Sequence, residues 1–210
     1  MGGPPTTRER TPRGQGELLR EGLIDAAMEI LDEGHDVSEL SIRGVTRRAG
    51  VSPTAFYLHF EDREELMLAV LERGFTEFGE LIQQGADRGA DPQQRLMSAC
   101  AAYIAFSREW PGRYRLLFAP DLEGEESPGE SAEVPTAGDA AFGDLVELIT
   151  DYLGGGRSPE QTQAVALGFW MGLHGYATLC GALPTSVDDL TDDQYVASLT
   201  TAWLGPPTGR

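Results

Sequence analysis

The sequence lacks an apolar run of about 20 residues, the length that a membrane-spanning helix needs. Its first residues, MGGPPTTRERTPRG, are polar and include arginine, whereas a secretory signal peptide requires an apolar stretch. We therefore expect the protein to remain in the cytoplasm. Its apolar content of 40% is that of a globular protein with a core of its own.

Cysteine and histidine are scarce, which limits the chemistry that the chain offers. The two cysteines, Cys100 and Cys180, lie far apart and outside any CxxC pair, so we expect buried thiols rather than a disulfide framework or a zinc site. The three histidines, His35, His59 and His174, fit no metal-ligand spacing. We expect no metal ion and no cofactor.

Lysine is absent, and the sixteen basic residues are all arginine. The formal net charge of −18 opposes binding to nucleic acid, because phosphate repels carboxylate. The charge is unevenly distributed, however. Residues 41–60 contain three arginines and no acid, whereas residues 61–210 contain 25 acids and nine arginines. Most of the negative charge therefore lies in the part of the chain that follows residue 60.

Apolar residues recur at helical spacing along the chain, with neither an alternating strand pattern nor a repeat. The sequence therefore predicts an all-α fold. A first helix is expected from about Leu18 to a stop at Gly34, and a second from Ile42 to Ala49. The later helices are expected at about residues 53–60, 62–84, 91–110, 112–120, 139–153, 158–183 and 191–204.

Residues 41–60 have the pattern of a helix-turn-helix. Gly50 can adopt the left-handed conformation that ends a helix, and Ser52 and Pro53 suit the cap and the first position of the next helix. Phe56 and Phe60, four residues apart, would pack that helix against the other two. Its remaining surface is small or bears hydroxyl groups, as a helix that enters a DNA groove requires.

Residues 40–70, LSIRGVTRRAGVSPTAFYLHFEDREELMLAV, resemble the DNA-binding domain of the TetR (tetracycline repressor-like) family. The resemblance extends over about residues 18–70, and its core, AGVSPTAFYLHF, is highly specific. It implies a dimer that binds operator DNA. The residues to which it assigns contacts with DNA are Ser41, Arg43, Ser52, Thr54, Ala55, Tyr57, His59 and Arg63.

Within this resemblance, Thr54 and Ala55 would face base edges, whereas Tyr57 and His59 would reach phosphates. An ordinary surface histidine at position 59 and a packing role for Tyr57 are the alternatives. Leu58 stands where relatives often have a polar residue. Its apolar side chain would suit a thymine methyl group or would simply pack.

The resemblance also implies that Ser41 and Ser52 contact the DNA backbone from the starts of two helices, and that Arg43 reaches a base or a phosphate. At the start of the fourth helix, Arg63 replaces the lysine that is usual in the family. The charge is retained, so a phosphate contact is expected to survive, although a guanidinium group prefers a different geometry.

In the carboxy-terminal half, Trp170 and His174 lie four residues apart and therefore on one helical face. With Gly175 they resemble the Trp-then-His-Gly (WHG) signature of one carboxy-terminal class of the same family, and the segment PGRYRLLFAPDL fits that class. The resemblance implies that this half senses a ligand. His174 is then either a core residue bonded to a carbonyl group or a ligand contact.

Several aromatic residues of this half are expected to be mainly core, and a subset is expected to wall a pocket for a hydrophobic or aromatic small molecule. With His174, the candidates are Tyr103, Phe106, Trp110, Tyr114, Phe118 and Trp170.

A stripe of small residues in the helix predicted at 158–183 would let another helix approach closely, and large residues near the carboxyl terminus would complete a dimer bundle. A purely internal contact is the alternative. The candidates are Ala164, Gly168, Gly172, Gly175, Tyr195, Leu199 and Trp203.

These patterns predict a flexible arm at residues 1–16, a DNA-binding domain at 17–62, a helical ligand-binding and dimerisation domain at 63–204, and a tail at 205–210. Residues 121–138 are rich in acid, proline and glycine, so we expect a disordered loop there. The sequence favours a homodimeric repressor that binds a palindromic operator and associates with the nucleoid when bound to DNA. A small-molecule effector would release it.

The alternatives to this function are an enzyme and a helical interaction module. An enzyme is not expected, because the sequence has no GxSxG elbow, no phosphate-binding loop after a strand and no HExxH helix. A helical interaction module that has lost DNA binding is supported only by the acidity of the chain. The sequence leaves the effector, the operator and the choice between repression and activation open.

Overall fold

The computed structural model describes residues 15–35, 39–118, 136–179 and 190–206. All regular secondary structure in these residues is helical, which confirms the predicted all-α fold. None of these helices is both long and apolar enough to cross a membrane. The helices are α1 (Gln15–Asp32), α2 (Ile42–Arg48), α3 (Pro53–Phe56), α4 (Arg63–Ala86), α5 (Pro92–Glu109), α6 (Pro111–Phe118), α7 (Thr136–Leu153), α8 (Pro159–Leu179) and α9 (Asp192–Leu204).

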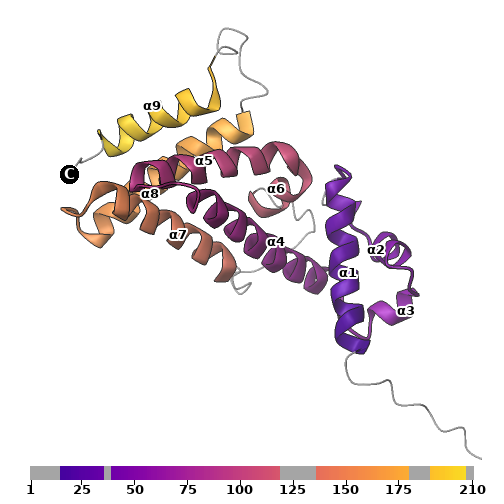
Figure 1. Ribbon diagram of the computed structural model, residues 1–210. Helices are drawn as coiled ribbons and strands as arrows, with labels where there is room; N and C mark the ends of the chain where they lie inside the picture. The colour runs from indigo at the N-terminus through magenta and orange to yellow at the C-terminus, as the bar shows by residue number, and fades with distance from the viewer. Residues whose placement is uncertain (1–14, 36–38, 119–135, 180–189, 207–210) are drawn as a thin grey trace, which may run out of the picture.

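Helices α1 to α3 form one end of the molecule, and α4 leads from them into a bundle of the other helices (Figure 1). Ser41 caps α2 and Ser52 caps α3, whose first residue is Pro53. Between the two helices, Gly50 has a φ of 70°, the left-handed conformation. These features confirm the predicted helix-turn-helix.

The core of this end is built around two phenylalanines that follow each other by one helical turn. Phe56 and Phe60 are fully buried, and their ring centroids are 5.4 Å apart. They belong to the same buried cluster as Leu23 of α1 and Val45 of α2. The guanidinium group of Arg20 lies over the Phe60 ring, 5.1 Å from its centroid, and covers it from the solvent side.

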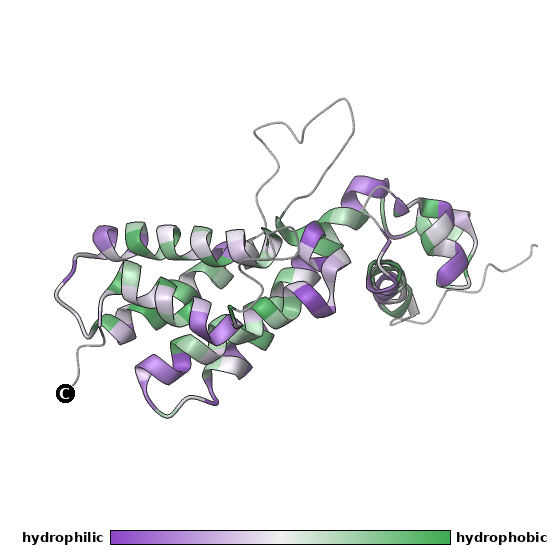
Figure 2. Cartoon of the chain, turned by 90° about the horizontal axis from the view of Figure 1, so that it is seen from above, coloured by the Kyte–Doolittle hydropathy of each residue, from purple (hydrophilic) through white to green (hydrophobic). Residues whose placement is uncertain are grey.

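Helix α4 is long enough to take part in both ends of the molecule. It starts behind the cap Asp62, which accepts a hydrogen bond from the backbone N–H of Glu65 at 2.9 Å, and it packs against α1, α5 and α7. Within the bundle, apolar residues face the neighbouring helices and hydrophilic ones face outward (Figure 2). The helix starts expected at about residues 62 and 91 are confirmed, with Asp62 and Asp91 as the N-caps.

Several helix ends differ from the sequence-based expectation, and α3 ends at Phe56 rather than at about residue 60. Helix α7 begins at Thr136, so residues 136–138 are helical rather than part of a loop. These residues are small, and apolar periodicity therefore does not reveal them. Helix α1 begins at Gln15, inside the expected arm, and α8 ends at Leu179. The rest of the expected arm, residues 121–135, Cys180 and residues 207–210 of the expected tail lie outside the described residues.

Candidate functional site

The exposed part of residues 41–60 forms a surface without acidic side chains, which we call the acid-free surface. On it, Thr54, Tyr57 and Leu58 are exposed and lie three and four residues apart, so they share one helical face. The Tyr57 ring meets the edge of Phe56 with the centroids 5.4 Å apart, yet 58% of Tyr57 is exposed. Tyr57 therefore combines a packing contact with an open outer side.

The hydroxyl groups of Ser41 and Ser52 are exposed helix caps. Each accepts a hydrogen bond from the backbone N–H three residues later, at 3.1 and 3.2 Å respectively. As a cap, the hydroxyl oxygen accepts through a lone pair, so its O–H can still donate a hydrogen bond to an oxygen outside the chain. Both serines are therefore placed to donate to a phosphate group that approaches the helix starts.

The three arginines of the acid-free segment divide into two roles. Arg43 and Arg47 are exposed, and neither forms an ion pair within the part of the chain that the structure describes. Arg48 pairs instead with Glu29 of α1 at 3.4 Å and with Glu33, directly after the end of α1, at 2.6 Å. Arg43 and Arg47 thus supply the positive charge of the surface, whereas Arg48 joins α2 to α1.

The other predicted DNA contacts are less open. Ala55 and His59 are half-buried, and a Cβ at Gly16 of α1 would lie 3.5 Å from Cε1 of His59. Arg63 donates a hydrogen bond from Nε to the carbonyl oxygen of Leu40 at 2.7 Å. Sequence reasoning missed this contact, which holds the start of α4 against the segment that precedes α2.

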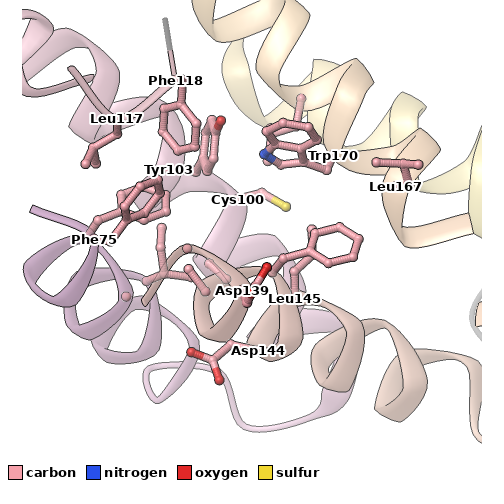
Figure 3. Close-up of a pocket in the computed structure, with 18 residues that line it drawn as sticks. Phe75, Cys100, Tyr103, Leu117, Phe118, Asp139, Asp144, Leu145, Leu167 and Trp170 are labelled. Carbon is pink, nitrogen blue, oxygen red and sulfur yellow. The ribbon is translucent and has the colours of Figure 1, made fainter. Parts of the chain in front are cut away.

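A cavity of about 390 Å³ lies among helices α4 to α8 (Figure 3). Its wall is mainly apolar and includes the aromatic rings of Phe75, Phe78, Tyr103, Phe118 and Trp170. These rings come from four different helices, so the cavity exists only where the helices of the bundle meet. Its size and lining are those of a small-molecule site.

The charge of the cavity lining comes from two carboxylates of α7, Asp139 and Asp144. Neither has an ion pair or a hydrogen bond among the described residues. Burial raises the pKa of the Cys100 thiol to about 12 and also raises the pKa of the Tyr103 phenol, so both groups remain neutral. The described lining therefore offers an anion no positive charge.

The structure divides the candidate pocket residues into two groups. Tyr103, Phe118 and Trp170 line the cavity as expected from the sequence, but Phe106, Trp110, Tyr114 and His174 do not. Phe106 is buried against Phe78 and Trp110, with ring centroids 5.0 and 5.5 Å apart. Sequence reasoning missed three further aromatic residues of the lining, Phe75 and Phe78 of α4 and Phe142 of α7, because helical spacing does not distinguish a cavity wall from packed core.

His174 belongs to a hydrogen-bonded cluster with two tyrosines beside the cavity. Its Nδ1 lies 2.7 Å from the hydroxyl of Tyr114 and 3.0 Å from that of Tyr103, and the two hydroxyls are 3.2 Å apart. Burial lowers the pKa of His174, which favours the neutral ring. The bonds of Nδ1 thus go to two tyrosine hydroxyls rather than to a carbonyl group, which was one of the two alternatives, and they hold the Tyr103 ring in the cavity wall.

Helix α6 touches both the cavity and the helix-turn-helix end. Leu117 and Phe118 at its last turn line the cavity. Gly112 at its first turn lies on the end of α1, where an added Cβ would be 2.2 Å from the carbonyl oxygen of Leu31. Only glycine allows this approach, so α6 and α1 meet backbone to backbone.

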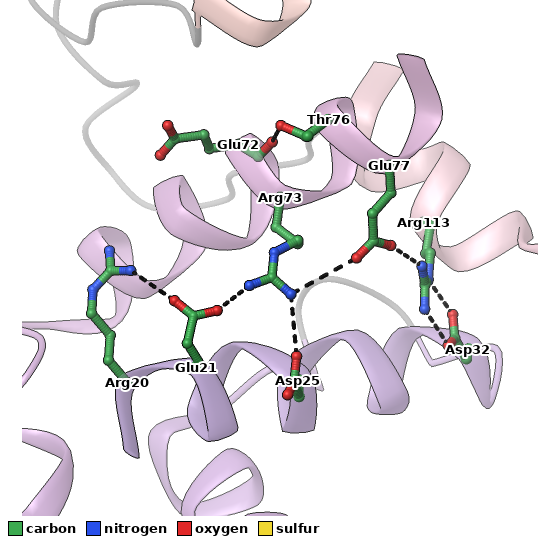
Figure 4. A network of polar contacts seen from close by, with 9 residues as sticks. All are labelled: Arg20, Glu21, Asp25, Asp32, Glu72, Arg73, Thr76, Glu77 and Arg113. Atoms are coloured by element: carbon green, nitrogen blue, oxygen red, sulfur yellow. Dashed lines mark hydrogen bonds and ion pairs between the residues drawn. The ribbon is translucent and has the colours of Figure 1, made fainter. Parts of the chain in front are cut away.

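Ion pairs strengthen the attachment of α1 to α4 and α6 (Figure 4). Arg113 of α6 binds Asp32 of α1 in a bidentate fashion and Glu77 of α4 at 2.6 Å. Arg73 of α4 pairs with Asp25 of α1 at 3.3 Å. Helix α6 is thus tied to α1, the helix against which α2 packs.

The predicted dimer residues are largely engaged within the chain. An added Cβ at Gly168 would lie 2.3 Å from the Trp203 ring, and one at Gly172 would lie 2.6 Å from Cδ1 of Leu199. Tyr195 also donates a hydrogen bond to the carbonyl oxygen of Gly172 at 2.8 Å. The small residues at 168 and 172 therefore admit α9 of the same chain, which is the internal alternative.

Two sequence comparisons agree with this geometry. Residues 23–70 match the model of bacterial regulatory proteins of the tetR family. Residues 96–201, half of the chain, match the model of a tetracyclin repressor-like carboxy-terminal domain.

Solved structures share the fold over most of the chain. A protein of unknown function from Rhodococcus sp. RHA1 is 27% identical, with a TM-score of 0.71 over 90% of this chain and 95% of that one. A TetR family transcription regulator from Marinobacter aquaeolei VT8 is 17% identical, with a TM-score of 0.59 over 91% and 96% of the two chains. A tetR-family transcriptional regulator from Streptomyces coelicolor is 18% identical, with a TM-score of 0.64 over 87% and 81%. The chain belongs to the TetR family of transcription regulators, which bind DNA and are not enzymes.

Proposed function

We propose that this regulator is a homodimeric repressor that binds a palindromic operator through the acid-free surface and is released by an apolar small molecule. The observation that carries the proposal is the exposure of Thr54, Tyr57 and Leu58 on one face without acids. Arg43 and Arg47 give the same surface a positive charge, although the chain as a whole carries −18. Such a surface is suited to a DNA groove.

The proposed contacts follow from exposure and chemistry. Thr54 and Ala55 face base edges, Tyr57 and His59 reach phosphates, and Arg43 reaches a base or a phosphate. The capping hydroxyls of Ser41 and Ser52 donate to the DNA backbone, and Arg63 adds a phosphate contact if its bond to Leu40 is shared or exchanged. We place residues 17–62 in the DNA-binding domain and 63–204 in the second domain, with the protein in the cytoplasm and on the nucleoid.

The dimer is proposed to form through the outer face of α8 and α9. Met171 of α8 is 61% exposed, and Ala164 lies two turns before it. Leu167, one turn after Ala164, is 47% exposed and also lines the cavity. Trp203 of α9 is 46% exposed beside Gly168. An uncharged face of this kind is buried well against its own copy, and a two-fold dimer presents its recognition helices about one DNA turn, ~34 Å, apart. Sedimentation as a monomer at micromolar concentration would contradict the dimer.

The cavity is proposed to hold the effector. Its aromatic faces and the absence of a positive charge in the described lining favour an uncharged or cationic aromatic compound over an anion. Entry of the compound would displace Phe118 and Leu117, and α6 would transmit the movement to α1 through Gly112 and Arg113. By linkage, operator DNA must weaken binding of the compound by the same factor by which the compound weakens operator binding.

Selection of DNA from random duplexes with the full chain tests the proposal, and the enriched sequence should be a palindrome. Tyr57→Ala should lower affinity for every sequence by about tenfold, because it removes a phosphate contact, whereas Thr54→Ala should relax discrimination at one base position. Thr150→Ala, an exposed threonine of α7, is the matched control and should change neither property. Absence of any enriched DNA would contradict DNA binding and favour the interaction module.

A further inference from the structure

Leu58 has the highest exposed fraction of any large apolar side chain in the described residues, 75%. Single exposed leucines are common on protein surfaces and need no explanation by themselves. The position of this one is specific, because it lies between Tyr57 and His59 on the acid-free surface. The sequence left two roles open for Leu58, packing within the chain and contact with DNA, and its exposure excludes the first.

The backbone fixes the direction in which Leu58 faces. Helical hydrogen bonds continue past the end of α3, from Leu58 N–H to Ala55 O at 3.3 Å and from Phe60 N–H to Phe56 O at 3.1 Å. Phe56 and Phe60 fill the opposite side of this turn and are fully buried. Leu58 therefore cannot rotate into the core, and it shares its face with Thr54, four residues earlier.

The side chain of leucine has no hydrogen-bond donor or acceptor, so it cannot bind a phosphate group or the polar edge of a base. In the major groove, the apolar group that bases present is the C5 methyl group of thymine. Against guanine, adenine or cytosine, the leucine would cover polar edges that water otherwise satisfies. An apolar side chain held on a groove-facing surface thus discriminates in favour of thymine.

We propose that Leu58 reads the methyl group of one thymine in each operator half-site and is a specificity-determining residue of this regulator. The inference rests on the proposed binding of operator DNA by the acid-free surface. It adds that one position of each half-site is recognised by apolar contact rather than by hydrogen bonding.

The test removes the methyl group and leaves the rest of the DNA unchanged. Each thymine pair of the selected operator is replaced in turn by uracil, which lacks only this methyl group, and affinity is measured by titration at fixed salt. At one symmetric pair of positions the wild-type protein should bind about fifteenfold more weakly, which is about fourfold per half-site, the value of one methyl group withdrawn from water. The other positions should show little change.

Two variants connect the effect to Leu58. Leu58→Ala should bind the thymine and uracil operators with equal affinity at that pair, because the partner of the methyl group is gone. Leu68→Ala truncates a leucine of α4 that is 40% exposed, and it should retain the full preference for thymine. Circular dichroism should show that both truncations leave the helical content unchanged.

The failures of the two proposals are distinguishable. If wild-type protein binds a selected operator but responds to no uracil replacement, or if Leu58→Ala keeps the uracil penalty, the inference about Leu58 is wrong and operator binding stands. A half-site without thymine would overturn it in the same way. If no operator is enriched at all, the proposed function itself fails, and the inference fails with it.

Discussion

The acid-free surface and the cavity differ in how far apart in the sequence their residues lie. Twenty consecutive residues build the acid-free surface, and its caps, its left-handed glycine and its buried phenylalanines act over three or four positions. The cavity takes its wall from five helices, with lining residues between Phe75 and Leu173. A surface built locally can be interpreted from the sequence, whereas a cavity depends on where distant helices meet.

The two regions also differ in charge. Arg43 and Arg47 give the acid-free surface its exposed positive charge, whereas Asp139 and Asp144 give the cavity a negative one. The difference suits an anionic partner at one end and an uncharged or cationic partner at the other. Both differences can be tested separately.

Removing the local core behind the acid-free surface should have the largest effect. Phe56→Ala empties a fully buried site and should lower the free energy of unfolding by about 3–5 kcal/mol, measured by urea titration with circular dichroism. Tyr57→Ala is the control, since Tyr57 is 58% exposed, and it should cost less than about 1 kcal/mol. Equal losses in the two variants would show that the two faces of the turn are not distinct.

The charge of the cavity can be probed with two dyes that share one aromatic skeleton. N-phenyl-1-naphthylamine is uncharged, and 8-anilinonaphthalene-1-sulfonate adds a sulfonate group. In fluorescence titrations the uncharged dye should bind about fivefold more tightly, because the charged side chains in the lining are Asp139 and Asp144. Asp144→Asn should reduce the difference in affinity between the two dyes. Cys100→Trp, which fills the cavity, should lower the affinity for both dyes. A stronger affinity for the sulfonate would contradict the proposed ligand class.

The smallest expected effect concerns the cluster beside the cavity. Burial lowers the pKa of His174, so the unfolded chain takes up a proton at higher pH than the folded one does. The stability linked to His174 is therefore present above about pH 6.5, the ordinary pKa of histidine, and it is lost as the pH falls through that value towards the lowered pKa. Urea titrations between pH 7 and 5.5 should show the decrease, and His174→Gln should reduce it. An identical decrease in the variant would assign it to other groups.

The helices and the acid-free surface could be predicted because their signals are short in range. Ser41, Ser52, Asp62, Asp91 and Thr191 each cap a helix by accepting the backbone N–H three residues later, so the sequence alone places these helix starts. That Thr54 and Tyr57 share an exposed face also follows from the sequence, because residues three apart lie on one side of a helix. The start of α7 was missed because its first residues are small and carry no apolar stripe.

The cavity could be predicted only in part, since the composition of a helix does not fix its rotation against four others. Tyr103 and Phe106 lie three residues apart on α5, yet one ring lines the cavity and the other is packed core. Gly168 and Gly172 correctly indicated a close helix approach. The sequence could not show that the approaching helix is α9 of the same chain rather than a helix of a second copy.

The contact at Gly112 joins α6 of the bundle closely to α1 at the helix-turn-helix end. Where two helices meet through side chains, a small movement of one can be absorbed by a change of rotamer in the other. Here no side chain stands between α6 and the carbonyl oxygen of Leu31, and the Arg113 guanidinium group holds the neighbouring carboxylates. If α6 moves, as proposed for effector binding, we expect α1 to move with it, because no side chain at this contact can change its rotamer to absorb the shift.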